Sequence, residues 1–176
     1  MIFALGLSGC EGQDPEPSPP SACALLDDAL VNKAVGTQDW TAQNDSIEAD
    51  DDRALALCDI VSDDVTLTIK SSYPADPVVI EENIRQQLDS PDFEDTLAEP
   101  CTAYTGAPLT GIGCQQVTGG SERQDAYIYG HADDTSFSVV LSDAPPALPS
   151  SEQLEIAERL TTAFLDGFAA FRDSST

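Results

Sequence analysis

The chain has 176 residues, enough for one domain with a hydrophobic core, and its 41% hydrophobic content is too high for a disordered chain. Its 32 acidic and 7 basic residues give a formal net charge of −25. This charge would repel nucleic-acid phosphates and anionic lipid headgroups, which argues against nucleic acid as a partner. Solubility or salt adaptation is the simplest explanation of the acidity, and attraction to a basic protein surface is the second.

The N-terminal residues have the character of the end of a secretory signal. Residues 2–7 form a short apolar run, and two small residues and Cys10 follow it. So short a run cannot cross a bilayer, and no basic region precedes it, so we interpret residues 1–9 as the remnant of a truncated signal peptide. The placement of Cys10 resembles the lipobox of bacterial lipoproteins, in which this cysteine carries diacylglycerol after cleavage. The resemblance implies contact with the membrane through lipid on Cys10; a free or disulfide-bonded cysteine is the alternative.

A proline- and acid-rich segment separates Cys10 from the rest of the chain. Its four prolines, at positions 15, 17, 19 and 20, favour extended polyproline geometry and exclude a helix. We therefore interpret residues 10–21 as the lipidated cysteine with its tether, and residues 22–173 as a single globular α+β domain.

An exported protein with an even number of remaining cysteines is expected to form disulfides. The cysteines after Cys10 are Cys23, Cys58, Cys101 and Cys114. They allow three connectivities, of which we favour neighbours in order, Cys23–Cys58 and Cys101–Cys114. A zinc site is the competing use, but the chain has no C-x-x-C motif and His131 is its only histidine, so we expect no metal and no cofactor.

The first residues of the domain predict one short helix and a loop. Asp27 is a good N-cap and Gly36 is a typical C-terminal stop, which predicts a helix between them. Residues 37–52 are mostly polar and acidic, so we interpret them as a loop.

The next segment predicts a hairpin followed by a helix. Residues 54–61 and 65–70 are rich in β-branched and apolar residues, and the second stretch alternates apolar with polar. Asp76 and Pro77 are an N-cap and a first-turn proline, which start a helix that ends at Ser90.

The C-terminal half predicts a long irregular loop, two strands and a helix. Residues 92–120 contain prolines and several glycines and are interpreted as the loop, and strands follow at 124–131 and 136–142. The last helix begins at Ser150 and carries apolar residues at helical spacing. The predicted order is α-β-β-α-loop-β-β-α, an α+β fold with an antiparallel sheet of about four strands and helices packed on one face.

One strand carries a row that could form a ligand site. Tyr127, Tyr129 and His131 share a face of the strand and could line a shallow site for a hydrophobic or sugar ligand, although such a row is more often covered by a helix. His131 could also act as a base near Ser136, but its place beside a hairpin turn is more typical of a solvated histidine. No catalytic motif is present, so we expect no enzyme activity.

The motifs together resemble a family of actinobacterial cell-envelope lipoproteins of unknown function. The resemblance rests on the lipobox, the proline-rich tether, the sequence Cys23-Ala24-Leu25-Leu26 at the opening helix and its stop at Gly36. Cys58 matches the family's second cysteine, which supports its pairing with Cys23. The chain departs from the family pattern at Ile60, usually aromatic, and at Cys114, usually acidic. A looser similarity is to extracellular sensor domains of mycobacterial serine/threonine kinases.

Two functions are compatible with these features. The first is a non-catalytic interaction or accessory module, held by lipid at the outer face of the bacterial cytoplasmic membrane and bound to a membrane or envelope protein complex. The alternative is a small-molecule or lipid-binding envelope lipoprotein, which would need an apolar cavity between sheet and helices. An envelope hydrolase would require His131 to be buried against a serine or aspartate in a cleft.

Overall fold

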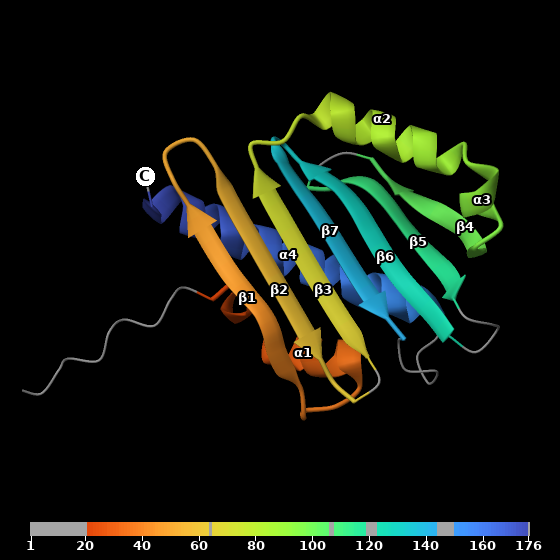
Figure 1. The fold of residues 1–176 in the computed structure, drawn as a ribbon, viewed down its shortest axis with the longest axis horizontal. Coiled ribbons are helices and arrows are strands. Elements are labelled where there is room, and N and C mark those ends of the chain that lie inside the picture. Colours follow the sequence, from red (N-terminus) through yellow and green to blue (C-terminus); the bar gives the residue numbers. More distant parts are fainter. Residues whose placement is uncertain (1–20, 64, 106–107, 119–122, 144–149, 176) are drawn as a thin grey trace, which may run out of the picture.

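A computed structural model describes residues 21–63, 65–105, 108–118, 123–143 and 150–175. The predicted signal remnant, Cys10 and the tether up to residue 20 lie outside the described residues. Residues 22–173, predicted as the globular domain, contain nearly all the helices and strands, which are shown in Figure 1.

The described chain folds around one antiparallel sheet of seven strands. The strands follow the order β1-β2-β3-β7-β6-β5-β4 across the sheet, so that β1 and β4 are its edges (Figure 1). Their bounds are β1 Thr41–Ala49, β2 Ala54–Val61, β3 Thr66–Tyr73, β4 Leu97–Tyr104, β5 Thr110–Thr118, β6 Arg123–Ala132 and β7 Thr135–Ser142.

The prediction of about four strands is wrong, because three further strands form in segments predicted as loops. Strand β1 lies within residues 37–52, and β4 and β5 lie within residues 92–120. β1 gave no signal because it is an edge strand in which only Ile47 is buried, so its sequence does not alternate. β4 is interrupted by two shifts in its register with β5, and it contains Pro100 at the sheet edge, where proline is tolerated.

Glycines in β5 misled the interpretation of this segment as a loop for a different reason, whereas β6 was predicted as a strand. Gly111 of β5 and Gly130 of β6 are paired across the sheet. A Cβ atom on Gly111 would overlap the carbonyl oxygen of Tyr129, and one on Gly130 would overlap that of Thr110. These glycines therefore permit a close approach of two strands and do not mark a turn.

The helices lie on both faces of the sheet, which corrects the prediction of helices on one face. Helix α4 (Ser150–Ser175), helix α1 (Asp28–Val35) and the 3₁₀ turn η1 (Cys23–Leu25) pack together on one face (Figure 1). Helix α2 (Pro77–Leu88), followed by the short α3 (Pro91–Glu94), packs on the other face over β5 and β6. The alternation of β6 shows this, since its Ile128 packs in the α4 layer whereas Tyr127 and Tyr129 contact the α2 layer.

The predicted caps and the predicted apolar stripe are confirmed. The Asp27 side chain accepts a hydrogen bond from the Leu30 amide at 3.0 Å, and Gly36 ends α1 with a φ of 76°. Asp76 caps α2 in the same way through the amide of Val78, at 2.9 Å. On α4 the residues Ala157, Leu160, Phe164 and Phe168 are at most 1% exposed, so this helix forms the main hydrophobic layer with the sheet.

Candidate functional site: the open face of the sheet

Half of the sheet has one face without a helix over it in the part of the chain that the structure describes. Helix α2 covers β5 and β6 on that side, whereas β1, β2, β3 and β7 face outward there (Figure 1). We call this surface the open face. Ser46, Leu57, Lys70 and Ser138 form one row across it, because the register pairs Ser46 with Leu57, Leu57 with Lys70 and Lys70 with Ser138.

The sequence of the strands produces this face by simple alternation. In β7, Phe137, Val139 and Leu141 are at most 1% exposed and point to α4, while Ser138 and Val140 between them are partly accessible. β3 repeats the pattern, with Leu67 and Ile69 buried and Lys70 exposed. Strands with one buried and one polar face are typical of antiparallel sheets whose second face contacts water or a partner.

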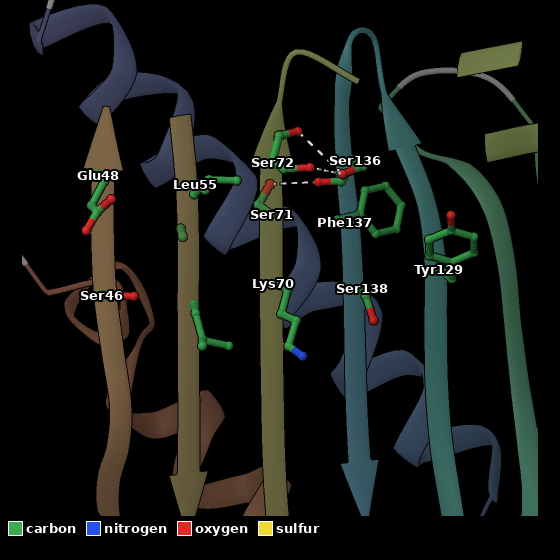
Figure 2. A pocket seen from close by; sticks show the side chains of 12 residues that line it. Ser46, Glu48, Leu55, Lys70, Ser71, Ser72, Tyr129, Ser136, Phe137 and Ser138 are labelled. Carbon is green, nitrogen blue, oxygen red and sulfur yellow. Dashed lines mark hydrogen bonds between the residues drawn. The ribbon is translucent and has the colours of Figure 1, made fainter. Parts of the chain in front are cut away.

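A groove of about 440 Å³ lies on the open face. The short side chains of Ser72, Ser136 and Ser138 lie between the longer Leu55 on one side and Tyr129 on the other (Figure 2). Leu57, which is paired with Lys70, lines the groove on the same side as Leu55. Because the serines of β3 and β7 do not fill the space between their taller neighbours, the surface is hollow there.

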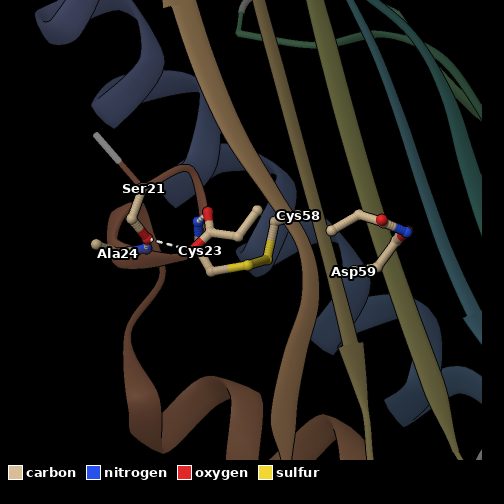
Figure 3. Close-up of a disulfide and its surroundings, with 7 residues drawn as sticks. Ser21, Cys23, Ala24, Cys58 and Asp59 are labelled. Atoms are coloured by element: carbon tan, nitrogen blue, oxygen red, sulfur yellow. Dashed lines mark hydrogen bonds between the residues drawn. A yellow bond between two sulfur atoms is a disulfide. The ribbon is translucent and has the colours of Figure 1, made fainter. Parts of the chain in front are cut away.

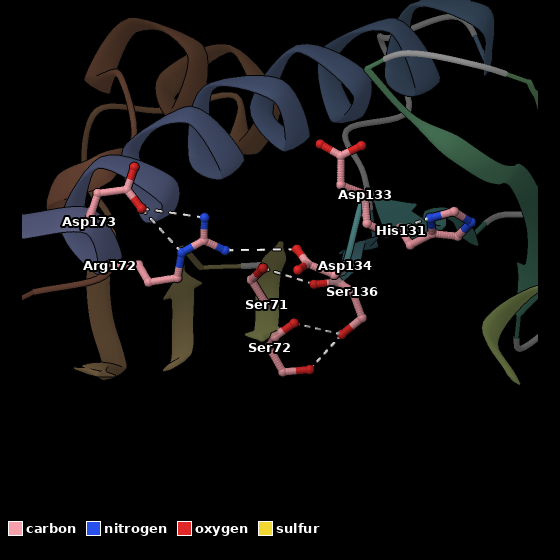
Figure 4. Close-up of polar contacts among 8 residues, drawn as sticks. All are labelled: Ser71, Ser72, His131, Asp133, Asp134, Ser136, Arg172 and Asp173. Atoms are coloured by element: carbon pink, nitrogen blue, oxygen red, sulfur yellow. Dashed lines mark hydrogen bonds and ion pairs between the residues drawn. The ribbon is translucent and has the colours of Figure 1, made fainter. Parts of the chain in front are cut away.

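Serine hydroxyl groups hold one end of the groove in place. The hydroxyl oxygens of Ser72 and Ser136 lie 2.6 Å apart, and the Ser71 hydroxyl donates to the Ser136 carbonyl at 2.8 Å (Figures 2 and 4). Lys70 and Ser138 are not part of this hydrogen-bonded cluster. Within the described residues, neither side chain makes a hydrogen bond or an ion pair.

The predicted row of Tyr127, Tyr129 and His131 does share one face of β6, but α2 covers much of it. The Tyr127 hydroxyl donates to the side-chain oxygen of Gln87 on α2 at 3.1 Å. The Tyr127 and Tyr129 rings are stacked, with their centroids 6.3 Å apart. Of the three residues, Tyr129 is the one that lines the groove on the open face.

His131 is buried rather than solvated, contrary to the interpretation of its place beside a turn. Its Nδ1 atom lies 3.1 Å from the carbonyl oxygen of Asp133, and its Nε2 atom lies 3.2 Å from a carboxylate oxygen of Glu81 on α2. Ser136 is its neighbour on β7, but the Ser136 hydroxyl is bonded to Ser72 (Figure 4). Both ring nitrogens are therefore engaged elsewhere, and the geometry contains no histidine–serine pair of the kind that activates a nucleophile.

A second pocket of about 440 Å³ lies between the C-terminal half of α4 and the turn that joins β6 to β7. Arg172 of α4 closes one side of it. The Arg172 guanidinium lies 4.2 Å from the centre of the Tyr73 ring. It also lies 4.0 Å from a carboxylate oxygen of Asp134 (Figure 4). These contacts tie the end of α4 to the sheet, which is a structural role. In the described chain, no three His, Cys, Asp or Glu side chains form a group that could hold a metal ion.

Both disulfides have the predicted pairing. Cys23–Cys58 joins η1 to β2 on the α4 side (Figure 3), and Cys101–Cys114 joins β4 to β5. Asp45 of β1 supports the first bridge, because its carboxylate accepts from the Cys23 amide at 2.9 Å and from the Ser21 hydroxyl at 2.6 Å. Since disulfides persist in oxidising compartments, the bridges indicate a non-cytoplasmic protein. Among the helices that the structure describes, none combines the length and apolar character that crossing a bilayer requires.

Burial of Tyr127 under α2 gives a testable pH dependence. Burial raises the pKa of the Tyr127 phenol from 10.0 to about 12, since the charged form is poorly solvated there. The resulting contribution to stability is complete below pH 10 and is lost as the pH rises through 12. In an alkaline titration followed by phenolate absorbance, we expect a phase near pH 12 in the wild-type protein that is absent from Tyr127→Phe. A titration in which Tyr127→Phe leaves this phase unchanged would contradict the burial under α2.

Sequence reasoning missed the open face because its residues come from distant parts of the chain. In the sequence, Lys70 is only the last residue of the predicted strand 65–70, and Leu57 is only one apolar residue of the predicted strand 54–61. The available signal was a lysine on the polar side of an alternating strand, in a chain with two lysines in total. Comparisons with models of known families, with curated proteins and with solved structures find no match to this chain.

Proposed function

We propose that this protein is a lipid-anchored, non-catalytic interaction module of the bacterial envelope, and that its open face docks onto a membrane or envelope protein complex. The observation that supports this proposal is the uncovered half of the sheet. Leu55 on this face is 47% exposed, and Leu57, the next residue of β2 on the same face, is partly exposed beside it. Contiguous exposed apolar side chains with polar residues around them are typical of protein interaction sites.

The charge of the chain favours a basic partner. The formal net charge is −25, and exposed Asp50, Asp51 and Asp52 lie in the turn between β1 and β2, next to the open face. Complementary charge accelerates association and disfavours acidic competitors. The engaged nitrogens of His131 support the non-catalytic part of the proposal, since a general base needs a free lone pair directed at its substrate.

The proposal is tested by affinity capture from native membranes in mild detergent, using the tagged, lipidated protein. Two matched variants separate the open face from the rest of the surface. Leu55→Arg places a cation on the open face, and Val79→Arg places the same cation on α2, at side chains that are 47% and 53% exposed. We expect a stoichiometric partner with wild type and Val79→Arg, and its loss with Leu55→Arg. Equal capture by both variants would contradict docking through the open face, and unchanged capture by Cys10→Ala would contradict the role of the anchor.

The second candidate is a small-molecule or lipid-binding lipoprotein. The space between the sheet and α4 does not favour it, because Phe137, Phe164 and Phe168 fill that layer and are 1% exposed. The groove on the open face favours it instead, since its volume of about 440 Å³ is in the range of small-ligand pockets.

A further inference from the structure

We infer that the groove on the open face binds an organic carboxylate that carries one negative charge and an apolar body. Lys70 and Ser138 bind the carboxylate, and Leu55, Leu57 and Tyr129 contact the body. This inference goes beyond docking onto a protein and rests on the groove alone, so it can fail while docking stands.

The first argument is the pair of free donors in the groove. Lys70 and Ser138 are directly paired in the register of β3 and β7, which places their side chains next to each other on the same face. Within the described residues neither of them has a hydrogen-bond or ion-pair partner. An ammonium group and a hydroxyl group side by side can both donate to one carboxylate, and charge-assisted hydrogen bonds of this kind are the stronger ones.

The second argument is the position of Lys70 in so acidic a protein. The other lysine of the chain, Lys33, forms an ion pair with Glu152 at 2.8 Å. Lys70 lies on β3, an interior strand of the sheet, where lysine is disfavoured and where its charge is not matched by an ion pair. An anion bound next to Lys70 would be attracted by its ammonium group, whereas the many acidic residues of the chain would repel it at other places.

Two carboxylates limit the charge that the ligand can carry. Glu48 lines the groove, and Asp59 lies diagonally across from Lys70 on β2. One oxygen of Asp59 accepts from the Asn44 side chain at 2.7 Å, and the other is buried without a partner in the described chain. These charges disfavour a second negative charge on the ligand, so a carboxylate fits better than a phosphate dianion.

The third argument is the apolar wall of the groove. Leu55 stands on one side of the serines and Tyr129 on the other (Figure 2), and Leu57 lines the groove on the side of Leu55. A body that lies along this wall covers apolar surface now exposed to water, which contributes about 25 cal/mol for each Å² removed from water. The groove volume of about 440 Å³ accommodates an alkyl chain of medium length or a compact ring system.

Isothermal titration calorimetry on the full-length protein at neutral pH tests the inference, with three ten-carbon probes below their micelle concentrations. The probes are decanoate, decyl phosphate and decyltrimethylammonium, which share the chain and differ in charge. We expect saturable binding of one decanoate per protein, weaker binding of decyl phosphate and no saturable binding of the cation. Absence of saturable decanoate binding, or tighter binding of either other probe, would overturn the inference.

Variants locate the binding in the groove. Lys70→Met keeps most of the side-chain stem and removes the charge, so we expect decanoate to bind at least about tenfold more weakly. We expect a smaller loss from Ser138→Ala and none from Lys33→Met, which makes the same charge change at the other lysine. Amide chemical shifts should move on β2, β3 and β7 with wild type. Decanoate affinity that survives Lys70→Met in a folded protein would refute the site, whereas the capture experiment with Leu55→Arg and Val79→Arg tests docking separately.

Discussion

Replacing Phe164 by alanine is expected to lower the free energy of unfolding by about 3–5 kcal/mol. Phe164 is 1% exposed and lies on the stripe of α4 that packs against the sheet. Truncation removes the transfer free energy of the ring and leaves a cavity, since the strands beneath it cannot move to fill the space. Denaturation in urea with the disulfides intact measures the change, provided that the slope with denaturant stays that of wild type.

Val79→Ala is the matched control, because it also shortens an apolar side chain on a helix. Val79 is 53% exposed on α2, so we expect its free energy of unfolding to stay within about 0.5 kcal/mol of wild type. Similar small effects from both variants would show that α4 does not form the main hydrophobic layer with the sheet.

Removing the Cys23–Cys58 bridge by a double alanine substitution is expected to lower the free energy of unfolding by about 4 kcal/mol. The bridge spans 35 residues, so its loss restores many conformations to the unfolded chain. It also ties η1 to β2, where Asp45 accepts from the Cys23 amide. Urea denaturation of the purified variant measures the change, and mass spectrometry with thiol alkylation confirms that the second bridge is intact.

The Cys101–Cys114 bridge provides the internal comparison. It spans 13 residues, so the same loop-entropy relation gives about 3 kcal/mol for its double alanine variant. Loss of the bridge that closes the longer loop should therefore lower the free energy of unfolding by about 1 kcal/mol more than loss of the other bridge. A larger loss from the shorter loop would mean that native contacts around β4 and β5, and not the unfolded chain, decide the contribution of these bridges.

Local patterns predicted the elements that carry their own signal. Asp27 and Gly36 bound α1, Asp76 caps α2, and the alternation of β7 separates its buried residues from its serines. In each case the residues that make the structure are within a few positions of one another. A cap or an alternating strand is therefore visible in the sequence before any tertiary contact is known.

Elements without such a signal needed the tertiary structure. β1 has almost no buried residue, and β5 carries glycines at a close approach to β6, so the sequence predicts a loop in place of each strand. Each of them joins the sheet because the neighbouring strand presents backbone N–H and C=O groups that would otherwise have no hydrogen-bond partner. The burial of His131 also depends on a segment that is distant in the sequence. Helix α2 covers it, and Glu81 of this helix lies 50 positions earlier in the chain.

The sequence by itself determined the acidic charge and the capped starts of α1 and α2, since composition and short-range patterns carry this information. For the four cysteines it left three connectivities open, and the structure has the one that we favoured. The resemblance to envelope lipoproteins also came from the sequence and stays a prediction. Only the tertiary structure decided the number of strands, the position of α2 on the second face and the groove that Lys70, Ser138 and Tyr129 share. Tyr129 and Ser138 belong to neighbouring strands of one hairpin, but Lys70 lies far from both in the sequence and is placed beside Ser138 by the register of β3 and β7, which depends on non-local pairing.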